Sequence, residues 1–132
     1  MGLSGARAYT NINATSGVEN ADPHMLIQML VDGAIEKTNM AKYFMSKKEW
    51  AKKGQHISWA ISIIGGLRAS LDINKGGEIA INLERLYEYS TATLIEANSE
   101  NDIDKLDSVL KVMKTIKEGW DGIREEGLAT AS

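Results

Sequence analysis

The sequence predicts an all-α protein, an antiparallel up-down four-helix bundle with a flexible N-terminal tail. Apolar residues recur at helical spacing over four stretches. No stretch of useful length alternates as a strand would, and short polar turns join the helical stretches, so neighbouring helices run antiparallel. The length of 132 residues fits one domain. We expect a mobile tail over 1–21, the bundle domain over 22–126 and a frayed end over 127–132.

The first helix is expected over residues 23–45. Asp22 can cap the exposed N–H groups, and Pro23 suits the first turn because no N–H is needed there. His24, in that turn, is expected at the surface. The buried side of this helix is predicted to hold Leu26, Met29, Leu30, Ala34, Ile35, Thr38, Ala41 and Met45.

The second helix is expected over residues 47–72, opened by a capping box in which Ser46 and Glu49 satisfy backbone donors. Its predicted core stripe is Trp50, Ile57, Ala60, Ile61, Ile64, Leu67 and Leu71. Gly65 and Gly66 lie inside it, each at a cost of about 1 kcal/mol relative to alanine. Such glycines are kept where something approaches closely, or where packing tolerates the loss.

The third and fourth helices follow two predicted turns, 74–77 and 98–101. The third, over 78–97, should bury Ile79, Leu83, Leu86, Tyr87 and Ser90. The fourth begins near Asp102, which favours the positive end of the helix dipole together with Asp104. Its predicted core stripe is Ile103, Leu106, Val109, Met113, Ile116, Trp120 and Ile123.

Three of these helices carry additional apolar or small residues away from the core stripe, when positions are turned by about 100° per residue. The residues concerned are Trp59, Ile63, Gly66 and Ser70 on the second helix, Ile81, Ala92 and Ile95 on the third, and Ser108, Val112, Thr115 and Gly119 on the fourth. A monomeric bundle needs one apolar stripe per helix. The surplus favours a binding surface for a partner helix, with a homodimer interface or chance as open alternatives.

Composition excludes several classes of function. The chain has no cysteine, so it has no disulfide, thiol nucleophile or cysteine-bound zinc. The net charge is −3, with +2 in residues 1–66 and −5 in 67–132, which gives no overall attraction for nucleic acid. The lysines at 47, 48, 52 and 53 are interpreted as a solvated cluster. Without a signal peptide or an apolar run of roughly 18–20 residues, we expect a cytoplasmic protein without membrane insertion.

No motif indicates catalysis. Neither His24 nor His56 follows a glutamate three residues earlier, as di-iron bundles require. The zinc-protease, Walker, dinucleotide and nucleophile-elbow patterns do not occur. Glu84 and Glu88, one turn apart, are interpreted as solvated helix charges. We therefore predict no enzyme, no catalytic residue, no metal and no cofactor.

Several segments in order resemble the flagellar secretion chaperone family FliS. The resemblance covers nearly the whole chain: Ala8-Tyr9 in the tail, residues 21–34 (ADPHMLIQMLVDGA), Leu71-Asp72, residues 76–89 (GGEIAINLERLYEY), and Leu94, Ala97-Asn98, Leu106, Val109 and Trp120. The chain departs from the family pattern at Val31, where tyrosine is usual. Trp59 and the Gly65-Gly66 pair are not family features and suggest a groove adapted to its own partner.

The resemblance implies a cytoplasmic chaperone that binds the disordered C-terminal segment of flagellin in surface grooves. It prevents premature polymerisation and aids flagellar type III export. Export-gate components or other flagellar proteins are further candidate partners. The family also implies that the tail covers part of the groove, and Tyr9 is the candidate residue. A non-catalytic helical adaptor or a homodimeric structural bundle is the alternative. The predicted partner-binding residues are Tyr9, Trp59, Ile63, Gly66, Ser70, Ile81, Ile95 and Val112.

Overall fold

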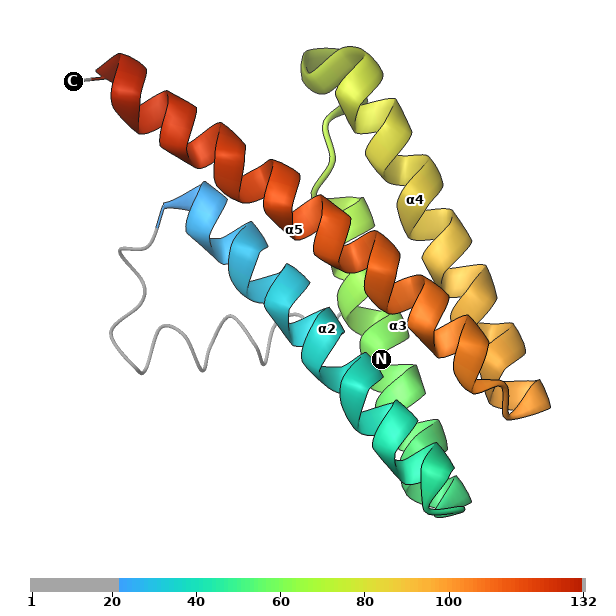
Figure 1. The fold of residues 1–132 in the computed structure, drawn as a ribbon. Coiled ribbons are helices and arrows are strands. Elements are labelled where there is room, and N and C mark those ends of the chain that lie inside the picture. The colour runs from blue at the N-terminus through green and yellow to red at the C-terminus, as the bar shows by residue number, and fades with distance from the viewer. Residues whose placement is uncertain (1–21, 132) are drawn as a thin grey trace.

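A computed structural model of the chain describes residues 22–131, with side chains as far as Gly122. Four helices form the bundle: α2 (Pro23–Ser46), α3 (Trp50–Ala69), α4 (Ile73–Glu100) and α5 (Ile103–Ala131). Each helix packs against two others, in the cyclic order α2, α3, α4, α5, and consecutive helices are antiparallel (Figure 1). The predicted fold class is confirmed. Within residues 22–131 no helix is long and apolar enough to cross a membrane.

Aspartates begin three of the helices by accepting hydrogen bonds from free backbone N–H groups. Asp22 accepts from Met25 at 2.7 Å, and Asp72 accepts from Lys75 at 3.1 Å. Asp102 accepts from the first turn of α5 at 3.0 and 3.4 Å. The predicted starts of the first and fourth helices are therefore confirmed.

The predicted capping box at the start of α3 is wrong. Ser46 is the last residue of α2, and its hydroxyl donates to the carbonyl of Tyr43 at 2.6 Å. Lys48 then takes a left-handed conformation with φ of 59°, and Glu49 precedes α3 without a side-chain cap. The chain reverses over 47–49, so Ser46 cannot reach the first N–H groups of α3.

α4 begins earlier than predicted, because 73–76 form a helical turn rather than an open loop. Gly77 then interrupts the helix with φ of 56°, a conformation that favours glycine. A Cβ on Gly76 would lie 2.7 Å from the Cβ of Ala80, so this position also excludes a side chain. The glycine pair thus creates a kink one turn into α4.

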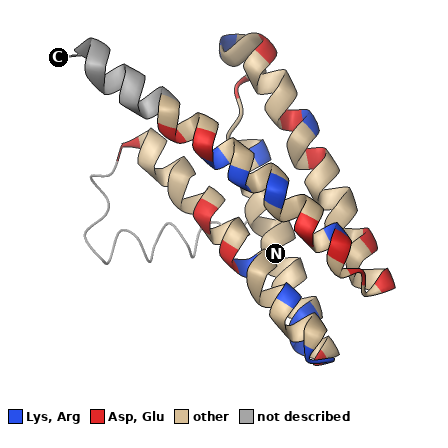
Figure 2. Ribbon diagram, viewed as in Figure 1, with Lys and Arg blue, Asp and Glu red and all other residues tan. Residues whose placement is uncertain are grey.

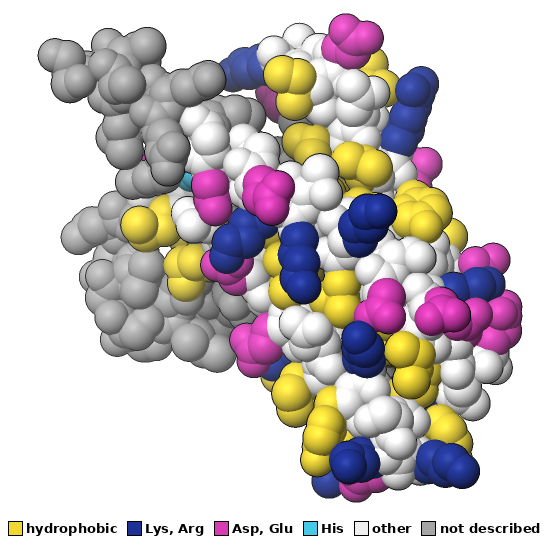
Figure 3. All heavy atoms as spheres, viewed as in Figure 1, with side chains coloured by type: hydrophobic (Ala, Val, Ile, Leu, Met, Phe, Trp, Pro, Cys, Tyr) yellow, Lys and Arg dark blue, Asp and Glu magenta, His cyan; other side chains and the backbone are white. Residues whose placement is uncertain are grey.

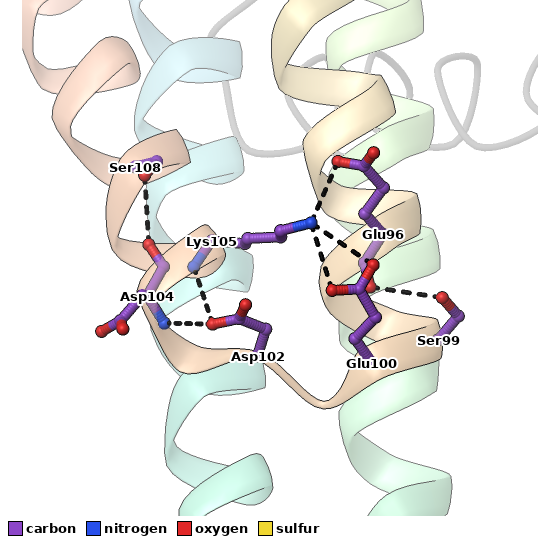
Figure 4. A network of polar contacts seen from close by, with 7 residues as sticks. All are labelled: Glu96, Ser99, Glu100, Asp102, Asp104, Lys105 and Ser108. Carbon is purple, nitrogen blue, oxygen red and sulfur yellow. Dashed lines mark hydrogen bonds and ion pairs between the residues drawn. The ribbon is translucent and has the colours of Figure 1, made fainter.

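The α4–α5 turn is held by polar contacts (Figure 4). Asn101 ends α4 in the left-handed conformation, with φ of 52°. The Lys105 ammonium lies between the carboxylates of Glu96 and Glu100, at 3.4 and 3.2 Å, and both carboxylates raise the pKa of Lys105. The turn therefore carries several carboxylates at this end of the bundle.

The core lies along the bundle axis and contains residues from all four helices. Most predicted core residues of α2 and α5 are buried or partly buried, and Val31, where the family usually has tyrosine, is fully buried. Three predicted core residues are instead exposed: Trp50 at 47%, Ile79 at 64% and Leu86 at 36%. On α4 the predicted burial of Tyr87 and Ser90 is confirmed, and the buried stripe also contains Ala80, Thr93, Leu94 and Ala97.

Candidate functional site: an apolar groove between α4 and α5

An open apolar groove follows the contact between α4 and α5. We define the α4–α5 groove by its lining side chains: Ile79, Leu83 and Leu86 from α4, and Val112, Thr115, Ile116, Gly119 and Trp120 from α5. It contains hollows of about 190 and 220 Å³, which share the lining residues Leu86 and Thr115 and therefore lie next to each other. Figure 3 shows hydrophobic side chains exposed where these two helices approach each other.

The sequence of each helix explains why the groove stays open. On α4, Ile79, Leu83 and Leu86 are spaced by four and three residues, so they share a face. That face borders the buried stripe through Ala80 and Tyr87, and α5 covers only part of it. On α5, a Cβ added at Gly119 would meet no atom within 4 Å. Gly119 thus leaves space unfilled beside the large side chains of α4.

A larger cavity of about 460 Å³ extends the groove to the end of the bundle. It shares the lining residues Leu83 and Trp120 with the neighbouring hollow, so the three spaces lie in succession, and we call this succession the path. The remaining lining residues are Pro23, His24, Leu26, Ile27, Ser70, Leu71 and Tyr87. The path therefore begins between α4 and α5 and ends where α2 starts and α3 finishes.

His24 and Trp120 connect α2 to α5 beside this cavity. Their rings stack with centroids 4.5 Å apart and an interplanar angle of 10°. The Trp120 indole N–H donates to the carbonyl of His24 at 2.9 Å, and His24 Nε2 donates to the carbonyl of Trp120 at 2.6 Å. His24 was expected at the surface but is half-buried in this reciprocal contact. The contact fixes the Trp120 ring as a common wall of two hollows.

The groove contains few polar or ionisable side chains. Its side chains are almost all aliphatic or aromatic, with Lys111 at the rim. Burial raises the pKa of Tyr87, at the cavity wall, to about 12, so this phenol stays neutral at physiological pH. Among residues 22–122, whose side chains the structure describes, there is no group of three or more His, Asp or Glu that could hold a metal ion. Such a surface suits burial of another apolar segment better than proton transfer.

The structure brings two of the predicted partner-binding residues to this path. Val112 is half-buried and lines the hollow with Leu86, while Ser70 is at the cavity end, where it also caps α3 by donating to the Leu67 carbonyl at 2.6 Å. Ile81 and Ile95 are 38% and 56% exposed on α4 but are not among the groove-lining residues.

The predicted strip on α3 is not the continuous exposed surface that the angular reading indicated. Ile63 is 6% exposed and belongs to the core cluster, which corrects its placement on an outer face. Trp59 is 45% exposed, but the Lys37 ammonium of α2 lies 3.7 Å from its ring centroid. Gly66 is half-exposed. The strip borders α2, so neighbouring packing covers its middle. Tyr9 is outside the described residues.

Four groove residues were predicted from their spacing to lie in the core and were therefore not predicted as groove residues: Ile79, Leu83, Leu86 and Trp120. Two signals in the sequence point to them. In the stretch 76–89, the apolar residues spread over a wider arc of the helix than one neighbouring helix can cover. Thr115 and Gly119 give α5 a face with small side chains, which leave part of that arc uncovered.

Fold and groove together define a class of protein: a small helical bundle with a long open apolar surface, the form that receives an amphipathic helix of another chain. Comparison with known proteins identifies the family. Residues 5–127 match the family described as Flagellar protein FliS. This chain belongs to the FliS family.

Its relatives carry consistent names. The chain is 44% identical over 121 residues to the flagellar secretion chaperone FliSB of Pseudomonas aeruginosa, covering 92% of this chain and 96% of the relative. It is 42% identical over 118 residues to the flagellar secretion chaperone FliS of Salmonella typhimurium, covering 89% and 87%. Identity to the FliS of Bacillus subtilis is 26% over 112 residues, covering 85% and 82%.

Proposed function

We propose that this chain is a cytoplasmic export chaperone that binds the disordered C-terminal segment of flagellin. It prevents the subunit from polymerising prematurely and keeps it ready for flagellar type III export. The observation that carries the proposal is the open α4–α5 groove in a chain whose relatives are named flagellar secretion chaperones. The protein acts by binding alone and uses no cofactor.

The groove offers a physical reason for binding. Ile79 and Leu86 are 64% and 36% exposed in the free protein, and an apolar helix of the client would remove them from water. A disordered client loses conformational freedom when it folds on the chaperone, which offsets several kcal/mol of the gain. Net affinity therefore depends on contacts along the whole path rather than in one hollow.

The candidate residues outside the groove extend this proposal. Val112 and Ser70 lie on the path, whereas Ile81 and Ile95 would contact client that continues over the outer side of α4. Trp59 and Gly66 remain candidate contacts at the α3 border. Residues 1–21 directly precede Asp22 and Pro23 in the sequence, and Pro23 lines the 460 Å³ cavity, so Tyr9 is a candidate to cover this cavity when client is absent.

The alternative is a non-catalytic helical adaptor or a homodimer that pairs its exposed apolar faces. Its supporting observation is the number of large apolar side chains exposed on α4, which include Ile73, Ile79, Ile81, Leu86, Tyr89 and Ile95. Export-gate components and other flagellar proteins are candidate additional partners in either case.

Calorimetry with the C-terminal segment of flagellin from the same organism tests the proposal. We expect saturable binding with a negative heat-capacity change, which marks apolar burial. The N-terminal segment of the same flagellin is the control and should bind at least tenfold more weakly. Equal affinity for both segments, or a tight dimer by sedimentation that ignores flagellin, would favour the alternative.

A further inference from the structure

Aromatic rings and lysines are paired along the outer contact of α2 with α3. Three of the four ring–ammonium contacts among the described residues lie here. The pairs and their distances to the ring centroid are Lys37 over Trp59 at 3.7 Å, Lys47 over Tyr43 at 5.7 Å and Lys52 over Phe44 at 5.5 Å. The fourth pair, Lys53 over Trp50, does not belong to this surface, because Lys53 is buried and its ammonium donates to Asn98 of α4. We call this surface the aromatic–lysine seam.

The rings of the seam form a connected row across the two helices. Tyr43 and Phe44 meet edge-on with centroids 5.3 Å apart, Phe44 is 5.0 Å from His56, and His56 is 6.2 Å from Trp59. Tyr43 is 52% exposed and Trp59 is 45% exposed. Aromatic side chains of this kind commonly supply much of the binding energy of protein interfaces. The core does not need these two rings, because they remain half in solvent.

The seam is also positively charged. Lys47 and Lys48 have no carboxylate partner among the described residues, while Lys37 and Lys52 each lie 3.6 Å from one carboxylate, Glu36 and Glu49. Figure 2 shows basic residues gathered at the α2–α3 turn and acidic residues at the α4–α5 turn of the same end. The seam therefore carries a local excess of lysine in a molecule whose net charge is −3.

We propose that the aromatic–lysine seam is a second docking surface, for an acidic amphipathic helix of a partner protein. Apolar side chains of that helix would pack on Tyr43 and Trp59. Its carboxylates would pair with the ammonium groups that the rings hold at the border. Charge complementarity selects the acidic partner, and ammonium groups already positioned over rings lose less freedom on binding. A single-stranded nucleic acid, which rings and lysines can also bind, is the competing ligand that the experiment distinguishes.

The seam is independent of the α4–α5 groove. α2 and α3 carry the seam, whereas α4 and α5 carry the groove, and in the cyclic packing order these pairs occupy opposite sides of the bundle. The two surfaces also differ in chemistry, because the groove has aliphatic walls and the seam has rings with cations. A client in the α4–α5 groove therefore leaves the seam free, and the two partners would compete only at Trp59, if the client continues past the groove to the α3 border.

Calorimetry of the full chain with synthetic helical peptides tests this inference. The probe is a helix of about 20 residues, roughly 30 Å long, with leucine and phenylalanine on one face and glutamate on its flanks. The comparison probe has lysine in place of glutamate, and a thymidine oligonucleotide represents single-stranded nucleic acid. We expect the acidic helix to bind at least tenfold more tightly than either, and to weaken as salt is raised.

Matched variants locate the binding. Tyr43→Ala with Trp59→Ala, and separately Lys47→Glu with Lys52→Glu, should each weaken the acidic peptide at least tenfold while the helical circular dichroism is unchanged. Lys75→Glu with Lys114→Glu changes the net charge equally at exposed positions outside the seam and should alter affinity less than twofold. The inference is overturned if the chain binds the lysine peptide or the oligonucleotide more tightly than the acidic peptide. It is also overturned if the seam variants and the control variant lose equal affinity for the acidic peptide.

A groove variant separates the two binding surfaces. Ile79→Ala with Leu86→Ala should leave affinity for the acidic peptide within twofold, whatever it does to flagellin. Loss of the peptide in this variant places the peptide in the groove and overturns the seam. Loss of flagellin binding with the peptide retained leaves the seam standing even if the proposed chaperone function fails.

Discussion

Replacing Ile79 and Leu86 by alanine removes the two α4 side chains that project most openly into the groove. Full burial of such a side chain contributes about 1.5–3 kcal/mol. Ile79 is 64% exposed and Leu86 36% exposed, so a bound helix can still cover about one whole side chain between them. The pair should therefore weaken client binding by about 2 kcal/mol, or roughly thirtyfold. The other 36% of Ile79 and 64% of Leu86 are already buried in the free protein, so the pair should also lower the free energy of unfolding by about 2 kcal/mol.

The assay is calorimetry with the flagellin C-terminal segment, accompanied by urea unfolding of each variant. Met40→Ala with Tyr43→Ala is the matched control, because these residues are 37% and 52% exposed on α2 and remove a similar apolar surface elsewhere. It should leave client affinity within twofold. If control and groove pairs weaken the client equally, or if the groove pair has no effect, the groove is not the binding site.

Four other substitutions give further tests. Lys53→Ala removes an ammonium that donates to Asn98 at 2.9 and 2.7 Å, and should lower the free energy of unfolding in urea by about 2–3 kcal/mol; a loss below 0.5 kcal/mol would show that these bonds contribute little. Because burial raises the pKa of Tyr87 to about 12, unfolding should become easier as pH rises from about 10 to 12, by up to about 3 kcal/mol. Tyr87→Phe should reduce that alkaline loss, and an unchanged pH profile would contradict this account. Ile63→Asp places a carboxylate in the core and should cost more than about 3 kcal/mol in thermal unfolding, whereas a fully stable variant would mean that Ile63 is not buried in solution. Gly119→Leu should stabilise the helix by up to about 1 kcal/mol yet weaken the client at least tenfold; unchanged affinity would exclude Gly119 from the contact.

Helix positions were predictable because they depend on local chemistry. Asp22 and Asp102 mark helix starts because their carboxylates accept hydrogen bonds from N–H groups within one turn. Pro23 and Asp104 follow them in first-turn positions that suit these residue types. The capping box at Ser46 and Glu49 failed although its pattern is the same kind of signal. A pattern of two residues does not specify the intervening backbone, and the left-handed Lys48 takes Ser46 out of reach.

Burial was less predictable because it depends on neighbours. The angular reading placed Ile63 on an outer face of α3, but α3 packs against both α2 and α4, so its covered arc is wider than one stripe. On α4 the prediction failed in the other direction: Ile79 and Leu86 were expected to be buried but are exposed. Each lies one residue from a buried position, Ala80 and Tyr87. Spacing fixes which residues share a face, whereas the position of the neighbouring helix decides where coverage ends.

The groove stays unfilled because Gly119 and Thr115 on α5 are small, at a cost in stability. Gly119 lowers helix propensity by about 1 kcal/mol relative to alanine, and a Cβ there would meet no atom within 4 Å. Nothing inside the bundle therefore requires glycine at this position. Thr115, which shares both hollows with Leu86, is likewise smaller than the space beside it. Larger residues at both positions would close the groove from within. The small residues keep apolar surface on α4 uncovered, as the proposed binding of a client helix requires.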